Sequence, residues 1–387
     1  MNHIYTDLHI HIGRTASGRP VKITGSKTLT LHNILHYAST QKGLDMIGII
    51  DCHSPEIIAE LEDLIKRGDM AELAEGGLRY KNTTLILGSE IEIYDSHCHG
   101  PIHVLAFLPT LEKMRAFSNW MSRYVKNITL SSQRIYVTGK ELQYKVYEYG
   151  GLFVPAHVFT PFKSLYGKGV KASLSEVFDP ELIDAIELGL SSDTFMVNGI
   201  KEIQHYPFLT HSDAHSLGKM AREYVSLKLK DANFLELRKA LKNEDERGIL
   251  ANYGLNPLLG KYYNTVCANC HKQVENELTQ CFNCSSTKLI KGVSTRIKEL
   301  SDTDAPAVRR PPYIHQVPLD FIPGLGKAML ERLLKAFGTE MNILHHVSKQ
   351  QLADVVPEKI ADLIDKARKG ELKIAHGGGG KYGKIIE

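Results

Sequence analysis

The sequence predicts an α/β fold followed by two smaller C-terminal parts, and three observations support this. Apolar runs alternate with amphipathic stretches from residue 1 to about 230, which is typical of a parallel sheet or a barrel. Four cysteines then form two Cys-x-x-Cys pairs. After a proline-rich segment the chain looks largely helical. A length of 387 residues is consistent with two or three domains.

The composition is that of an ordinary globular protein and excludes few functions. Hydrophobic residues make up 43% of the chain and charged residues 24%, and the formal net charge is +3. This mildly basic balance permits a nucleic-acid partner without requiring one. No apolar run approaches the roughly 20 residues of a membrane span, and we see no signal peptide. Metal binding is therefore the expected role of most of the six cysteines, in a reducing cytoplasm.

Polar side chains collect near the ends of the expected strands. We predict strands over residues 2–8, 46–50, 84–87, 102–108, 151–156, 184–188 and 207–210, and helices over 55–66, 111–125 and 141–149. In a β/α barrel the loops that follow the strands converge on one face. Histidines and acids at several strand ends would therefore meet in space.

The first of these groups is Asp7-Leu8-His9-Ile10-His11. Histidines at i and i+2 lie on the same face of a strand, as a divalent metal requires. The later strand ends supply further candidates, and carboxylates among them could bridge two ions. These candidates are His53, His103, His157, His211, His215, Asp51, Glu90 and Asp213.

Other residues compete with these candidates. Glu92 is an alternative to Glu90, and any single histidine can be a hydrogen-bonded core or surface residue. We expect several of the 18 histidines to lie outside a metal site, namely His32, His36, His205, His345 and His346.

The order of these motifs resembles that of the PHP (polymerase and histidinol phosphatase) domain family. The resemblance rests on Asp7 to His11, Asp51-Cys52-His53, Gly88-Ser89-Glu90, Ile102 to Leu105, Pro155-Ala156-His157 and Ser212 to His215, and it spans residues 1 to about 220. It implies a distorted (β/α)7 barrel with a trinuclear site, which would hold two or three divalent ions (Zn, Mn, Mg or Fe).

The resemblance also implies a role for each ligand. His9, His11, Glu90 and Asp213 would hold a first ion, and Glu90 would bridge to a second ion held by His103 and His157. His53 and His215 would help to hold a third. Asp213, Glu90 and His157 would be the catalytic residues. Two features depart from the family pattern: Cys52 stands where an Asp is common, and no histidine follows shortly after His11.

A second metal site is expected from the cysteine spacing. Cys267 and Cys270 are followed, ten residues later, by Cys281 and Cys284. Two such pairs form a closed tetrahedral site, which is typical of one structural Zn²⁺. His271, beside a ligand, is expected to play no part.

The segment after the prolines resembles a helix–hairpin–helix. Residues 321–328 read Phe-Ile-Pro-Gly-Leu-Gly-Lys-Ala and open an apolar helical pattern that ends at Gly338. Gly324 and Gly326 would let backbone N–H groups approach a DNA phosphate, and Lys327 would add charge. An ordinary turn between two helices is the alternative. Residues 354–369 could form a second, degenerate half.

Four parts are therefore expected: a catalytic barrel over 1–255, a four-cysteine zinc-ribbon domain over 256–300, a Pro-rich linker over 301–318 and a helical DNA-binding domain over 319–387. In this order they resemble the endonuclease Q family. The resemblance implies a DNA-repair enzyme that hydrolyses the phosphodiester 5′ to uracil, hypoxanthine, xanthine or an abasic site, using metal-activated water. Its partner would be lesion-containing duplex or single-stranded DNA, and its location the cytoplasm, associated with the nucleoid.

Basic residues near the barrel mouth are candidates for DNA contacts. Arg14, Arg19 and Lys22 follow the first motif, and the loop 163–171 with Tyr166 follows the His157 strand. Two other functions remain open: a phosphatase that acts on a small phosphate ester, and a DNA-binding module without catalysis. A small substrate would need neither the cysteine domain nor the hairpin, and a non-catalytic module would not need so complete a ligand set.

Overall fold

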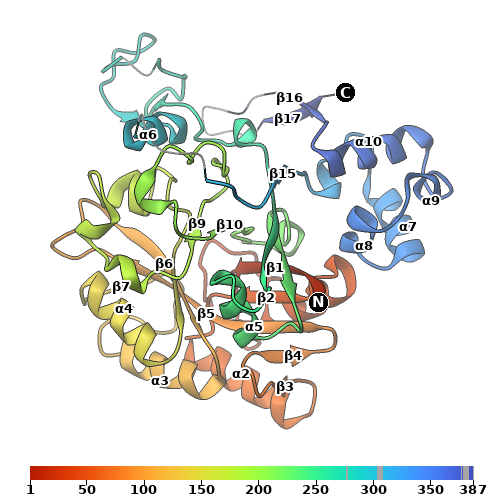
Figure 1. Cartoon of the computed structure of the whole chain (residues 1–387), viewed down its shortest axis with the longest axis horizontal. Helices are drawn as coiled ribbons and strands as arrows, with labels where there is room; N and C mark the ends of the chain where they lie inside the picture. The colour runs from red at the N-terminus through yellow and green to blue at the C-terminus, as the bar shows by residue number, and fades with distance from the viewer. Residues whose placement is uncertain (276–277, 303–307, 376, 378–382, 387) are drawn as a thin grey trace.

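Strands form the centre of the protein (Figure 1). In the computed structural model, residues 1–275, 278–302, 308–375, 377 and 383–386 are described. The central strands are β1 (Asn2–Ile10), β2 (Met46–Ile49), β5 (Thr83–Ile93), β6 (Ile102–Leu108), β8 (Leu152–Pro155), β9 (Ile186–Glu187) and β10 (Phe208–Leu209).

Backbone hydrogen bonds join these strands into a ring. β1, β2 and β5 pair in parallel, β6 pairs antiparallel with β5 and β8, and β9 pairs in parallel with β10. Between β8 and β9 the amide of Asp184 donates to the carbonyl of Phe153 (3.0 Å). The ring closes where the amide of Ala214 donates to the carbonyl of His9 (3.1 Å). The sheet is therefore a distorted barrel.

The expectation of parallel strands is wrong for β6. Residues 94–101, which connect β5 to β6, contain no helix, and a short connection without a crossover can only reverse the chain. The start of β6 consequently lies beside the end of β5, where His103 pairs with Glu92. His103 thus reaches the same face as the residues that follow the parallel strands.

Further strands extend the sheet on both sides. β11 (Tyr224–Leu229) pairs antiparallel with β1, β12 (Gly248–Gly254) follows it, and β15 (Tyr313–His315) pairs in parallel with β12. β15 lies in the segment predicted to be a linker, so part of that segment is an edge strand. Residues 303–307 of that segment lie outside the described part of the chain. The smaller strands beside β5 are β3 (Ala71–Glu72), β4 (Leu78–Tyr80) and β7 (Arg134–Ile135).

Helices cover the outside of the ring. They are α1 (Leu31–Tyr37), α2 (Pro55–Lys66), α3 (Leu111–Met121), α4 (Gly139–Glu148) and α5 (Phe234–Leu241). Capping fixes several of their starts: Thr110 accepts a hydrogen bond from the amide of Lys113, and Thr138 forms a capping box with Glu141. The predicted bounds are right for α2, and α3 ends earlier than expected.

Alternate residues of the strands belong to two apolar cores. Ile86, Leu105 and Val154 pack inside the ring, while their neighbours Leu85 and Val104 pack outward, in the core that includes the helices. Strand side chains alternate between faces. Glu90 therefore shares the inner face with Ile86, and His103 shares it with Leu105, at the mouth of the barrel.

The C-terminal third adds two small units (Figure 1). The cysteine segment contains β13 (Val266–Cys267) and β14 (Leu289–Ile290) and leads into α6 (Val293–Leu300). The helical unit contains α7 (Lys327–Phe337), α8 (Glu340–His345), α9 (Lys349–Ala353) and α10 (Glu358–Lys369), followed by the hairpin of β16 (Lys373–Ala375) and β17 (Lys384–Ile386). Residues 378–382 of the glycine-rich tail lie outside the described residues.

The helical unit packs directly on the barrel. Lys42 forms a buried ion pair with Glu340 of α8 (2.8 Å), and the ring of His345 stacks on Tyr5 of β1 at 4.4 Å. Among the described residues, no helix is long and apolar enough to span a membrane.

Candidate metal centre

Glu90 lies at the middle of a buried cluster of histidines at the barrel mouth. Its Oε1 lies 3.4 Å from Nε2 of His9, 2.9 Å from Nδ1 of His103 and 3.4 Å from Nε2 of His157. Its side chain is 1% exposed. The four residues come from β1, β5, β6 and the segment after β8, so the fold brings together ligand candidates that are far apart in sequence.

Asp213 forms the second focus of the cluster. Its Oδ1 lies 3.5 Å from Nε2 of His9, 3.4 Å from Nε2 of His11 and 3.2 Å from Nε2 of His215. About a third of its side chain is exposed (34%). Asp213 is therefore the acidic group of this cluster that a substrate can reach most directly.

An irregularity in β1 turns both histidines of the first motif inward. The pairing of β1 with β2 shifts register between Asp7 and Ile10. Leu8 packs in the inner core and Ile10 in the outer core. A bulge of this kind re-aims side chains at the rim of a barrel. The predicted common face of His9 and His11 is thus present at this bulge.

Two buried carboxylates hold these histidines from behind. Glu187 lies 3.0 Å from Nδ1 of His9, and Asp51 lies 3.1 Å from Nδ1 of His11. Contacts of this type fix the tautomer and leave Nε2 for a metal. Within the described residues, Nε2 of His9 and of His11 is buried without a hydrogen-bond partner.

Electrostatics favour ionised carboxylates in the cluster. Burial raises the pKa of Glu90, but the charges of His103 and Lys22 outweigh it and hold that pKa well below its usual range. Burial likewise opposes ionisation of Asp213, and His9, His11 and His215 hold its pKa well below its usual range. The pKa of His9 is raised, against the effect of burial, by Glu187 and Asp213. The same negative charge attracts a divalent cation.

The arrangement fits a centre for divalent ions. Two groups have ligand atoms within 4.8 Å of one another: His9 with Glu90 and His157, and His9 with His11 and Asp213. Histidine with carboxylate is a donor set for Zn²⁺, Mn²⁺ or Fe²⁺. His103, through its contact with Glu90, extends the first group. Glu92, the alternative to Glu90, instead lies at the edge of the cluster, where it forms an ion pair with Lys163 (2.8 Å).

The structure does not bring His53 into this cluster. Its Nδ1 lies 2.8 Å from the hydroxyl of Ser89, and its Nε2 lies 3.4 Å from the carbonyl of Leu130. Burial lowers the pKa of His53. Of the two histidines predicted for the third ion, His215 therefore lies in the cluster, beside Asp213, and His53 does not. Cys52, next to His53, is buried in the outer core.

Backbone strain marks two residues of the centre. His157 and Asp213 have φ values of +33° and +44°, in a region that side-chain-bearing residues rarely adopt. Gly189 approaches His157 so closely that a Cβ there would lie 2.9 Å from the His157 Cβ. A larger residue at Gly189 would therefore displace His157.

The four paired cysteines form a separate group. The sulfurs of Cys267 and Cys284 are 3.5 Å apart, as are those of Cys270 and Cys281, and all four ligand atoms lie within 4.8 Å of one another. A tetrahedron with Zn–S bonds of about 2.3 Å has edges of about 3.8 Å. These sulfurs therefore fit a closed metal site.

The residues predicted to contact DNA have varied surroundings. Arg19 is exposed and Arg14 half-buried beside the barrel mouth. Lys22 points inward to Glu90 instead (3.1 Å). Tyr166 is buried, stacks on Phe159 and donates to Glu202 (2.7 Å). Its apolar neighbours, invisible in the sequence, draw it into the core. With Lys168 and Lys171 it still borders a hollow of about 460 Å³, so a DNA groove along the loop 163–171 stays a prediction.

A tight turn through Gly324 and Gly326 precedes α7. Gly324 has a φ of +81°, and Gly326 is the N-cap of α7, with open space around its Cβ position. Lys327 is 91% exposed. The helical domain expected over 319–387 does not begin with a continuous helix, because residues 319–321 form a separate 3₁₀ turn before α7.

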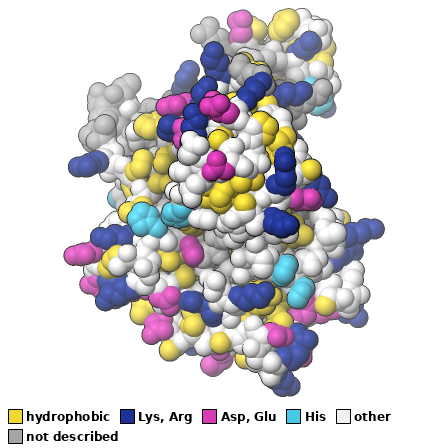
Figure 2. Space-filling model, turned by 90° about the vertical axis from the view of Figure 1, so that its right-hand side faces the viewer, with side chains coloured by type: hydrophobic (Ala, Val, Ile, Leu, Met, Phe, Trp, Pro, Cys, Tyr) yellow, Lys and Arg dark blue, Asp and Glu magenta, His cyan; other side chains and the backbone are white. Residues whose placement is uncertain are grey.

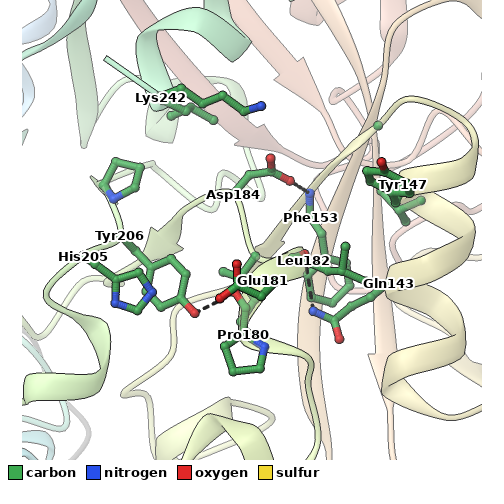
Figure 3. A pocket seen from close by; sticks show the side chains of 15 residues that line it. Gln143, Tyr147, Phe153, Pro180, Glu181, Leu182, Asp184, His205, Tyr206 and Lys242 are labelled. Carbon is green, nitrogen blue, oxygen red and sulfur yellow. Dashed lines mark hydrogen bonds between the residues drawn. The ribbon is translucent and has the colours of Figure 1, made fainter. Parts of the chain in front are cut away.

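Another pocket, shown in Figure 3, lies away from this centre. It has a volume of about 320 Å³ and is lined by α4, β8 and the chain around β9. Asp184 accepts a hydrogen bond from the amide of Phe153 at its edge (2.8 Å). None of the candidate metal ligands lines it, so it is not the metal centre.

Comparisons with known proteins identify the family. No family model matches the chain. The structure resembles that of the lesion-specific endonuclease PfuEndoQ from Pyrococcus furiosus with a TM-score of 0.85 and 32% identity, over 99% of this chain and 95% of that one. The chain belongs to the endonuclease Q family. It is thus an endonuclease, a hydrolase of ester bonds.

Three further proteins are similar to this chain. A structure of endonuclease Q in complex with a 27-mer duplex that carries an abasic lesion at the active site has a TM-score of 0.84 and 32% identity, over 99% of this chain and 96% of that one. The uncharacterized protein YqxK of Bacillus subtilis is 60% identical over the full length of both chains. The uncharacterized protein MJ0043 of Methanocaldococcus jannaschii is 36% identical over 59% of this chain and 31% of its own length.

Sequence reasoning missed two residues of the centre. Glu187 ends the apolar run 184–188, so the strand-end rule that found Glu90 would have found it too. Ser132 donates to Glu90 from a loop after α3, and no pattern in the sequence signals that contact.

Proposed function

We propose that this chain incises DNA on the 5′ side of damaged nucleotides, namely abasic sites and the deaminated bases uracil, hypoxanthine and xanthine. The observation that carries the proposal is Glu90 within reach of three histidines, with Asp213 facing His9 and His11 beside it. Membership of the endonuclease Q family supports it, since its relatives include a lesion-specific endonuclease and a complex with an abasic duplex.

The distances within the cluster support the following ligand roles. His9, His11, Glu90 and Asp213 would hold one ion, and Glu90 with His103 and His157 would hold another. When bound, such ions activate water and neutralise charge on a transferring phosphoryl group.

The chain's own residues prepare the reaction. Asp51 and Glu187 hold His11 and His9 in one tautomer. Asp213, partly exposed and ionised, would orient the attacking water through its free oxygen. His157 would orient Glu90 from its strained position. The four-cysteine group would hold structural Zn²⁺, which stabilises a unit too small for a core of its own.

DNA contacts would come from several separate places. On the face shown in Figure 2, basic side chains are interspersed with acidic ones, not gathered in one patch. Beside the mouth, Arg134 stacks between the exposed rings of Tyr94 and Tyr136, at 4.8 and 5.1 Å, an arrangement on which unstacked bases can lie. Arg14 and the hairpin of Gly324, Gly326 and Lys327 would add contacts to the backbone.

Incubation with four substrates tests the proposal. The protein with Mn²⁺ is given a labelled duplex with one uracil or one abasic site, the same duplex undamaged, and a small phosphate monoester. We expect incision of the damaged duplexes alone. Phosphate release from the monoester without incision would instead indicate a phosphatase, and DNA binding without either reaction a non-catalytic module.

A further inference from the structure

Lys22 brings a positive charge into the metal centre from the loop that follows His11. Its Nζ lies 3.1 Å from Oε2 of Glu90 and 2.6 Å from the hydroxyl of Ser132. The side chain is 15% exposed. Asp51 and Asp213 are the other carboxylates whose charges act on it. Three histidines surround Oε1 of Glu90. The ammonium thus contacts the other oxygen of that carboxylate, Oε2.

The loop that carries Lys22 is held against the barrel. The amide of Lys22 donates to the carbonyl of Ile12 (2.8 Å), and that of Val21 donates to the carbonyl of Gly13 (3.0 Å). A Cβ on Gly13 would lie 2.0 Å from the carbonyl oxygen of Ser26, so the segments pack without space between them. Lys22 is therefore positioned before any substrate arrives.

The same region lacks the ligands for a third ion. Both ring nitrogens of His53 face other partners, the Ser89 hydroxyl and the Leu130 carbonyl. Among the residues that the structure describes, His215 is then the ligand that remains from the predicted third group, and Asp213 beside it is shared with the first ion. Asp51 lies nearby with its Oδ1 unpartnered, but its Oδ2 holds His11 and the amide of Ile12. A single unshared ligand is fewer than the three or four protein ligands that a divalent ion usually requires.

We propose that Lys22 replaces a third metal ion in this chain. The barrel would hold two divalent ions. The Lys22 ammonium would be the third positively charged group beside the scissile phosphate. The catalytic part of this inference rests on the proposed function, but the number of ions does not. A fixed ammonium beside Glu90 also repels incoming cations. Removing its charge should therefore tighten metal binding and slow incision, two effects that a purely structural lysine would not combine.

Counting ions in the unmodified protein is the first test. The full chain is equilibrated with Mn²⁺ and freed of excess, and bound Mn and Zn are measured by mass spectrometry. We expect two Mn²⁺ per chain, with Zn²⁺ counted separately at the cysteines. Three Mn²⁺ per chain would overturn the proposal, whether or not the protein cleaves DNA.

Variants of Lys22 give the second test. In Lys22→Met we expect tighter Mn²⁺ binding and incision at saturating DNA slower by about 100-fold, the usual cost of losing one group that stabilises transition-state charge. Lys22→Arg keeps the positive charge and should retain most of the incision rate of the unmodified protein. Lys27→Met, which removes an exposed charge from the same loop, should match the unmodified protein. Unchanged or weaker Mn²⁺ binding by a folded Lys22→Met would contradict the proposal. If Lys22→Met does not fold, the ion count of the unmodified protein and the incision rate of Lys22→Arg still test the proposal.

Discussion

The Glu187 carboxylate joins two distant parts of the metal centre, since its Oε1 lies 3.0 Å from Nδ1 of His9 and 3.1 Å from Nδ1 of His211. Its Oε2 also accepts a hydrogen bond from the amide of His157 (2.9 Å). One buried side chain on β9 thus orients residues from β1, from the segment after β8 and from the segment after β10.

The first prediction concerns this carboxylate. Glu187→Gln keeps the shape of the side chain but removes the charge that supports His9, so Mn²⁺ affinity should fall by about 10- to 100-fold. Calorimetric titration with Mn²⁺ measures this change. Glu181→Gln alters an exposed acid close in sequence and should leave the affinity unchanged. Equal affinities for both variants would show that Glu187 does not support the centre.

The second prediction concerns the contact between the barrel and the C-terminal helices. Lys42→Met leaves Glu340 buried without its partner, which should lower the free energy of unfolding by about 3–5 kcal/mol. Denaturation in urea measures this loss. Replacing both partners by Met should cost less than the single change. Lys239→Met, in a more exposed pair with Asp245, should have a much smaller effect.

The third prediction is a pH dependence that originates at Glu223. Burial raises the pKa of Glu223 to about 8 from its usual 4.5. Between these values the unfolded chain loses this proton while the folded chain keeps it, so the contribution of Glu223 to stability falls as pH rises from 4.5 to 8. Between pH 4.5 and 8, the free energy of unfolding of the unmodified protein should therefore fall by on the order of 4 kcal/mol relative to that of Glu223→Gln. Urea denaturation at pH 5, 6.5 and 8 measures the difference. If the free energies of unfolding of the two proteins change equally with pH, Glu223 is not the origin of the pH dependence.

The fourth prediction concerns the cysteine group. Cys281 is buried among the other three sulfurs, so Cys281→Ala should release the bound Zn²⁺ and make residues 256–300 sensitive to proteolysis. Zinc content and limited proteolysis check these outcomes. Cys98→Ala, at a cysteine outside the group, should keep the metal. Mn²⁺ binding in the barrel should be unaffected by either change.

The sequence predicts the strand-end residues of the site well because a barrel brings strand ends together whatever the details of pairing. Glu90, His9 and Asp213 meet as expected, although they come from distant parts of the chain. Even His103 arrives correctly on a reversed strand, because the reversal places the start of β6 beside the end of β5. The family and its fold were predicted from the resemblance of these motifs, and of their order, to those of the PHP and endonuclease Q families.

Other features depend on packing that single-residue patterns do not carry. The direction of the Lys22 side chain follows from a loop held by Ile12 and Gly13, and the burial of Tyr166 follows from its stacking on Phe159. His53 has the right position in its motif, but its neighbours Ser89 and Leu130 occupy its nitrogens. In each case the deciding contact joins segments that the sequence alone does not place together.

The most direct test of the central claim is incision by the unmodified protein and by Asp213→Ala. A duplex with one abasic site, labelled in turn at each end, is incubated with Mn²⁺, and the products are sized. The unmodified protein should cut once, directly 5′ to the lesion, and Asp213→Ala should lower the rate by at least about 100-fold, more than is usual when a supporting residue is changed. Asp231→Asn, at an exposed acid paired with Arg79, should retain the rate. Incision that persists in Asp213→Ala would contradict the assignment of the metal centre.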